Sequence, residues 1–168
     1  MRYKTEIKWA ILFIVTSLLW MVLEKISGLH DTYLHLQQYI TVLFAIPAVW
    51  IYVVALREKK RLFYHGSMTF TQGFVSGLIM TLIITVCSPL TQWITSTIIT
   101  PDYFKNVIDY SVKTGYYSSV EEATAYFNLR NYIVESTIFA FGMGLITTAV
   151  VAFFLKTRRP TPSAKSSI

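Results

Sequence analysis

Clusters of basic residues alternate with long apolar segments along this chain, and this alternation restricts the fold more than any other feature. Lys and Arg are concentrated near the N-terminus, in residues 57–66 and near the C-terminus. The segments between them are long enough to cross the hydrocarbon layer as helices, which takes roughly 20 residues: 7–23, 39–56, 70–94 and 132–155. The sequence therefore predicts an all-α membrane protein with four transmembrane helices.

The distribution of Lys and Arg also predicts the orientation of these helices. Cytoplasmic flanks of membrane spans collect basic residues, so both termini and residues 57–66 are expected in the cytoplasm. This asymmetry accounts for the net charge of +6, and no nucleic-acid-binding surface is needed to explain it. The expected partners are the lipid bilayer and either a second copy of the chain or another membrane protein, and no nucleic acid.

Composition leaves little room for a separate soluble domain. Hydrophobic residues make up 54% of the chain and charged residues 14%. The four predicted membrane spans account for most of this apolar composition. We therefore expect residues 1–159 to form a single transmembrane domain. Residues 160–168 are rich in Pro, Ser and Thr and are expected to form a disordered basic tail.

Residues 100–131, between the third and fourth spans, have the pattern of a short amphipathic helical hairpin. Thr100 is a possible N-cap followed by proline and an acid, and Gly115 is a possible end for this first helix. Residues 118–121 match the capping box that begins a helix. Tyrosines accompany both helices, as is typical at the headgroup level. The hairpin is expected to lie on the outer leaflet as a lid.

Two prolines interrupt the predicted spans. Pro47 removes a backbone hydrogen bond from the second span and is expected to kink it. Pro89 lies near the predicted outer end of the third span.

Small residues in the third and fourth spans indicate close helix contacts. Gly73 and Gly77 begin a stripe of small and polar residues along one face of the third span, and Gly142 and Gly144 lie inside the fourth. Glycines at this spacing let two backbones approach closely. Helix packing is the favoured interpretation, a polar pathway is the other, and the motif does not say whether the contact lies within one chain or between two.

Polar residues near the outer ends of the spans form the candidate site. With the predicted topology, Glu24, Gln92 and Glu135 fall at a similar depth in the membrane. The nearby cations are Arg130 and Lys25. The plainer interpretation is that they are headgroup-level residues bonded to water. If they form a pocket instead, two close carboxylates raise one another's pKa and can hold a proton or a cation.

Other reactive groups give no recognisable site. Cys87 is the only cysteine, which excludes an intramolecular disulfide and a cysteine-rich metal site. His30, His35 and Asp31 have the chemistry of zinc ligands, but their spacing matches no standard pair, so no metal site is predicted. The chain has no serine nucleophile elbow, phosphate loop or zinc-protease motif. We therefore predict no catalytic residues, no cofactor and no enzymatic activity.

Three segments resemble a family of bacterial four-span membrane proteins known only as a domain of unknown function. They are residues 66–74 at the start of the third span, residues 99–103 after it, and residues 142–146 before the basic tail. The family often has serine near the position of Thr147, so the last match is looser. The resemblance covers most of the chain and implies the four-span architecture and a bacterial inner-membrane location. It implies no catalytic residues.

These observations favour a non-enzymatic inner-membrane protein with an interaction or envelope-support role. The alternative is a small oligomeric transporter or channel component assembled around the level of Glu24 and Glu135. A membrane-embedded enzyme ranks third, because the outer polar residues include no recognisable nucleophile or metal set.

Overall fold

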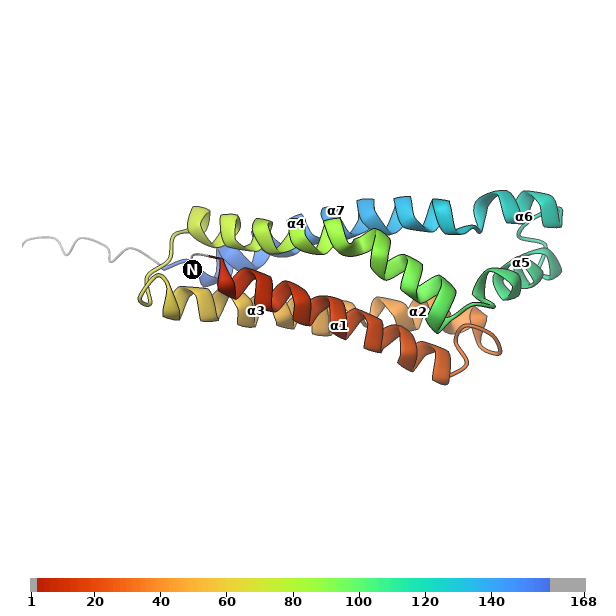
Figure 1. Ribbon diagram of the computed structural model, residues 1–168, viewed down its shortest axis with the longest axis horizontal. Coiled ribbons are helices and arrows are strands. Elements are labelled where there is room, and N and C mark those ends of the chain that lie inside the picture. The colour runs from red at the N-terminus through yellow and green to blue at the C-terminus, as the bar shows by residue number, and fades with distance from the viewer. Residues whose placement is uncertain (1–2, 158–168) are drawn as a thin grey trace, which may run out of the picture.

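The computed structural model describes residues 3–157, and within that range it consists of helices and turns. The elements are α1 (Lys4–Ile26), α2 (Leu34–Val42), α3 (Ala45–Leu62), α4 (Phe70–Ile94), the π-helix η1 (Thr95–Ile99), α5 (Tyr103–Lys113), α6 (Val120–Tyr126) and α7 (Leu129–Leu155). Figure 1 shows the long helices side by side, with α5 and α6 together at one end. This arrangement confirms the predicted fold class. The tail predicted for residues 160–168 lies outside the described residues.

The two ends of the bundle differ, and we name them here. The basic end carries the turn between α3 and α4, residues 63–69, and the start of α1 (Figure 1). The lid end carries the lid, residues 100–131, which includes α5 and α6. Four candidate membrane spans connect the two ends: Lys4–Ile26, Leu34–Leu62, Phe70–Ile99 and Leu129–Leu155.

The second span is longer than the predicted residues 39–56 and is broken into α2 and α3. Its 29 residues would extend about 44 Å as one helix, more than the roughly 30 Å of a hydrocarbon layer. At the break, the backbone N–H groups of Leu43, Phe44 and Ile46 donate to carbonyls three residues earlier instead of four. Pro47 has no N–H to offer the Leu43 carbonyl. The kink predicted at Pro47 therefore takes the form of a tightened helical turn just before the proline.

The lid forms the predicted hairpin, but its helices begin at other residues than the sequence suggested. Asp102 precedes α5, and the Thr100 hydroxyl donates to the carbonyl of Thr95, the first residue of η1, instead of capping α5. The N-cap of α6 is Ser119, whose side chain accepts the Glu122 N–H. The cap is shifted by one residue from the predicted box because serine and glutamate each occur twice in succession, so two registers are available.

The closest contact in the bundle is between α4 and α7. A Cβ added at Gly77 would meet the Thr148 side chain, and one added at Gly144 would meet the Thr81 side chain. The two threonine hydroxyls lie 3.3 Å apart, and the Tyr52 hydroxyl of α3 lies 2.9 Å from that of Thr81. The glycines leave room for a threonine of the opposite helix, and the hydroxyls satisfy one another in an apolar interior.

The other two glycines singled out in the sequence differ from each other. Gly73 faces Ala152 of α7 and the Met68 side chain. Gly142 has open space around its Cβ position among the described residues, so it lies outside the close α4–α7 contact. Gly144 lies four residues, about one helical turn, from Thr148 on α7, so both residues are on the face that contacts α4. Gly142, two residues earlier, is on a different face of the helix.

α4 leaves α7 toward the lid end. In Figure 1 the first part of α4 runs along α7, and its last turns bend toward α1. Pro89 lies inside α4 at this bend, and the Ser88 hydroxyl still donates to Ser136 of α7 at 3.3 Å. Beyond it, η1 contacts α1. Helix bends of this kind are expected at proline and at π-helical turns.

An ion pair that the sequence did not suggest joins α1 and α3 at the basic end. The Lys59 Nζ lies 2.8 Å from a carboxylate oxygen of Glu6, and both side chains are under 5% exposed. The same Nζ lies 4.1 Å from the ring centroid of Phe63. Buried charges of this kind are stable only when paired. Lys59 is therefore part of the packed interior, although its neighbour Arg61 is exposed.

We predict that Gly144→Val destabilises the bundle and that Gly142→Val does not. The valine at 144 collides with Thr81, and such overpacking costs about 1–3 kcal/mol, whereas the valine at 142 enters open space. Thermal unfolding in detergent, followed by tryptophan fluorescence, should show a lower midpoint for Gly144→Val only. Equal losses in both variants would contradict the α4–α7 contact.

Candidate functional site

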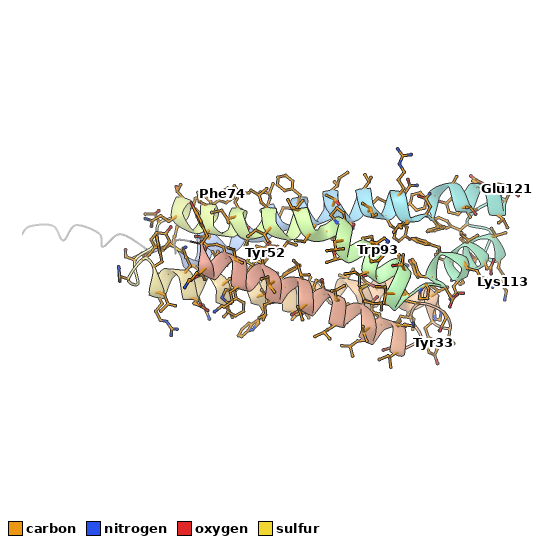
Figure 2. All side chains as sticks on the ribbon, viewed as in Figure 1. Tyr33, Tyr52, Phe74, Trp93, Lys113 and Glu121 are labelled. Atoms are coloured by element: carbon orange, nitrogen blue, oxygen red, sulfur yellow. The ribbon has the colours of Figure 1, made fainter. Side chains whose placement is uncertain are left out.

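A large cavity lies between the helices at the lid end. Its volume is about 1210 Å³, and α1, α2, α3, α4, α7 and the lid all contribute to its walls. Figure 2 shows Tyr52 in the middle part of the bundle, and this residue lines the cavity on the side toward the basic end. The cavity exists because α4 bends away from α7 at Pro89 and because the second span is interrupted at Leu43 and Phe44.

The lining changes from apolar to hydroxyl-bearing toward the lid. From α3 the lining residues are Ala45, Ala48, Val49 and Tyr52, so this wall is apolar apart from one hydroxyl. The lid contributes mostly hydroxyl-bearing side chains: Tyr103, Tyr110, Ser111, Thr114, Tyr116, Tyr117 and Tyr126. The cavity thus has the amphipathic character of the membrane boundary itself, with an apolar interior and a polar end.

Aromatic side chains close the end of the cavity. The Tyr103 hydroxyl of α5 donates to the Gln37 Oε1 of α2 at 3.2 Å and lies 3.4 Å from the Tyr132 hydroxyl of α7. The rings of Phe104 and Tyr132 meet edge to face, with centroids 5.1 Å apart. Tyr103 therefore connects the lid to both walls of the cavity.

A buried carboxylate attaches the lid to α1. Glu24 is 2% exposed; one of its oxygens accepts the Trp20 Nε1 at 2.5 Å, and the other lies 3.0 Å from the His30 Nε2. The His30 backbone carbonyl accepts the Asn106 side chain of α5 at 3.0 Å, and the His30 ring packs against Tyr103. A chain of contacts therefore runs from α1 through the following loop to the lid.

The five residues of the predicted polar cluster differ in burial and in partners. Glu24 is buried, whereas Lys25, Arg130 and Glu135 are exposed, and Gln92 donates to Ser96 one helical turn away at 3.0 Å. Within residues 3–157 no hydrogen bond or ion pair joins any two of these five. Sequence reasoning did not pair Glu24 with Trp20, which lies four residues earlier on the same helix face, or with His30.

Glu135 instead interacts with the lid. Its side chain is exposed on α7, although the neighbouring Ser136 still accepts a hydrogen bond from Ser88 of α4. The Glu135 carboxylate is hydrogen-bonded to the Tyr126 hydroxyl of α6 and raises the pKa of that tyrosine, with a smaller effect from burial. Glu135 therefore links α7 to α6.

In the loop between α1 and α2, the acidic residue Asp31 is hydrogen-bonded within the loop itself. The Thr32 backbone N–H donates to Asp31, and this hydrogen bond lowers the pKa of the Asp31 carboxyl below its usual value. His35 is exposed on α2 and contacts the Tyr33 ring. Among the described residues, no three His, Cys, Asp or Glu side chains gather as a group that would hold a metal ion.

We predict that Glu24→Ala loosens the lid, because the substitution leaves the half-buried Trp20 nitrogen and the buried His30 Nε2 without a partner. An unpaired buried donor costs about 1–3 kcal/mol, so amide hydrogen exchange across residues 103–113 should rise about tenfold. The matched control is Lys25→Ala, which removes the adjacent but exposed side chain. If both variants exchange at the same rate, Glu24 does not hold the lid.

One comparison with known proteins found a match. The family model described as "Protein of unknown function (DUF4199)" matches residues 8–157, from the first turns of α1 to just beyond the end of α7. Neither the curated proteins nor the solved structures contain a match to the chain. Because the match covers nearly the whole sequence and the resemblance noted in its segments agrees with it, this four-helix chain belongs to the DUF4199 family of proteins of unknown function.

Proposed function

We propose that this chain is a non-enzymatic protein of the bacterial cytoplasmic membrane that binds a lipid in the cavity at the lid end. The observation that carries the proposal is the cavity itself, about 1210 Å³ among helices long and apolar enough to span a membrane. Small-molecule sites usually measure about 300–1,000 Å³, and protein interiors contain few voids larger than a water molecule. A space of this size inside a bilayer has to be filled, and lipid surrounds it.

The position of the exposed lining residues supports entry of a lipid into the cavity from the side of the bundle. Val49 of α3 is 42% exposed, and Phe139 and Met143 of α7 are 68% and 42% exposed, although all three line the cavity. The two walls therefore carry apolar side chains that reach both the cavity and the surroundings. An acyl chain can pass between such walls without leaving an apolar environment.

The proposed orientation assigns the cavity to the outer leaflet. α3 ends in Lys59, Lys60 and Arg61 at the basic end, and basic flanks favour the cytoplasmic side. The lid and its tyrosines then face the periplasm. A protein that holds a lipid there has an envelope-support role, and it acts alone, with a second copy or with another membrane protein.

The cavity lining favours binding over catalysis. Its polar groups are hydroxyls, two glutamines and His35. Among the described residues, no hydrogen bond joins His35 to a lining serine or threonine, the arrangement that activates a hydroxyl nucleophile. This supports a non-enzymatic role.

The alternative, a small oligomeric transporter or channel component, has weaker support. Trp20 and His30 cover Glu24, and the Glu6–Lys59 pair closes the basic end. The hydroxyl contacts between Thr81 and Thr148 fill the middle of the bundle. A polar path therefore needs several copies of the chain, and ion flux abolished by Glu135→Gln in proteoliposomes would favour this alternative.

We predict that Ala140→Phe prevents lipid binding, because Ala140 lines the cavity from α7 and a phenyl ring there occupies the space of an acyl chain. Protein extracted from membranes in mild detergent should carry a bound lipid by native mass spectrometry, and the variant should lose most of it. The control is Val150→Phe on the same helix, which is exposed and lines no part of the cavity. Equal lipid on all three proteins, or none on the unmodified protein, would contradict the proposal.

A further inference from the structure

We infer that the lipid bound in this cavity has an uncharged head that donates and accepts hydrogen bonds, such as a free glycerol hydroxyl. The inference rests on the proposed function, since it names the class of lipid that the cavity accepts. Three observations on the cavity lining carry it.

The first observation is the absence of charged side chains around the cavity. Among the described residues that line it there is no Asp, Glu, Lys or Arg. A phosphate or ammonium group enclosed there would lose hydration without gaining an opposite charge, which costs several kcal/mol. Figure 2 shows Lys113 and Glu121 at the far tip of the lid. The Glu135 carboxylate lies behind the lining tyrosine Tyr126, and its negative charge disfavours an anionic head. His35, at the edge on α2, is exposed to solvent.

The second observation is the number of hydroxyls. Eight serines or threonines and seven tyrosines line the cavity, and each hydroxyl both donates and accepts hydrogen bonds. Several are already bonded within the protein, as with Tyr103 and Gln37. Such groups match an uncharged polar head, whereas a phosphate is better matched by Arg, Lys or a row of backbone N–H groups.

The third observation is an unpaired hydroxyl. The Thr41 Oγ1 is buried, has no hydrogen-bond partner and lines the cavity where α2 ends. Among the described residues, the other buried polar atoms without a partner are in His30 and Thr85, which do not line the cavity. A buried hydroxyl without a hydrogen-bond partner is unfavourable. A head hydroxyl in the cavity would supply that partner.

The direct test compares two photoreactive lipids with the same acyl chains, diacylglycerol and phosphatidic acid, which differ only in a hydroxyl or a phosphate head. With the protein in nanodiscs, diacylglycerol should label peptides that line the cavity at least about tenfold more than phosphatidic acid, as expected for a difference of 1.4 kcal/mol or more. Ala140→Phe should abolish this labelling, and Val150→Phe should leave it intact.

The outcomes separate the two proposals. If phosphatidic acid labels the cavity equally or better and Ala140→Phe abolishes the labelling, the inference fails and the proposed function stands. If neither lipid labels the cavity, or if Ala140→Phe leaves the labelling unchanged, the proposed function fails and the inference fails with it.

Thr41→Val isolates the unpaired hydroxyl. The substitution replaces a hydroxyl with a methyl group of similar size, so the lipid-free protein should keep or gain thermal stability. Diacylglycerol labelling should fall several-fold, because the head loses a hydrogen-bond partner. Unchanged labelling would mean that Thr41 does not contact the head.

Gln38→Lys tests the role of charge. Gln38 lines the cavity and is exposed, so the side chain can be replaced without disturbing the packed interior. The new cation should shift labelling from diacylglycerol toward phosphatidic acid. The control is Thr97→Lys, an exposed position at the same end of the bundle that does not line the cavity, where the preference should stay as it is. The same shift in both variants would contradict the inference.

Discussion

The contact between α4 and α7 is the constraint on which the rest of this structure depends. Each helix places a threonine against a glycine of the other, Thr81 against Gly144 and Thr148 against Gly77. Lipid provides no hydrophobic driving force between helices, so such close packing and hydroxyl contacts hold a membrane bundle together. The contact occupies the part of the bundle nearer the basic end, and the bend at Pro89 then directs α4 toward α1 (Figure 1). The cavity is the space left by this divergence.

Two buried carboxylates of α1 attach that helix to α3 and to the loop that supports the lid. Glu6 binds Lys59 of α3 at the basic end, and Glu24 binds Trp20 and His30 at the lid end. In an apolar interior each of these groups is costly without its partner, so the pairs fix how α1 lies against its neighbours. The lid therefore rests on α1 and α2 at one side and on α7, through Glu135, at the other.

The sequence predicted the elements far better than their contacts. Four apolar segments were sufficient to predict the spans, and the capping patterns predicted the hairpin to within a few residues, because span length and helix capping are local properties. The sequence placed Glu135 near the outer end of its span, but its contact with Tyr126 of α6 depends on how the lid folds over α7. His30 looked like a loop residue or a metal ligand, and its burial beside Glu24 depends on how residues 27–33 fold back. The cavity likewise follows from the direction of a bend, which a proline does not specify.

The most direct test of this account is the separation of the cavity walls in a lipid bilayer. Pairs of spin labels in a Cys87→Ser background can compare the two ends of the bundle: Val42 with Ile138 at the lid end, and Arg57 with Phe153 at the basic end, all of them exposed positions. Because the cavity lies between the second span and α7 at the lid end, the account predicts a clearly longer distance for the lid-end pair by pulsed electron paramagnetic resonance. Equal distances would mean that the helices run parallel along their whole length, which would contradict the cavity and everything proposed from it.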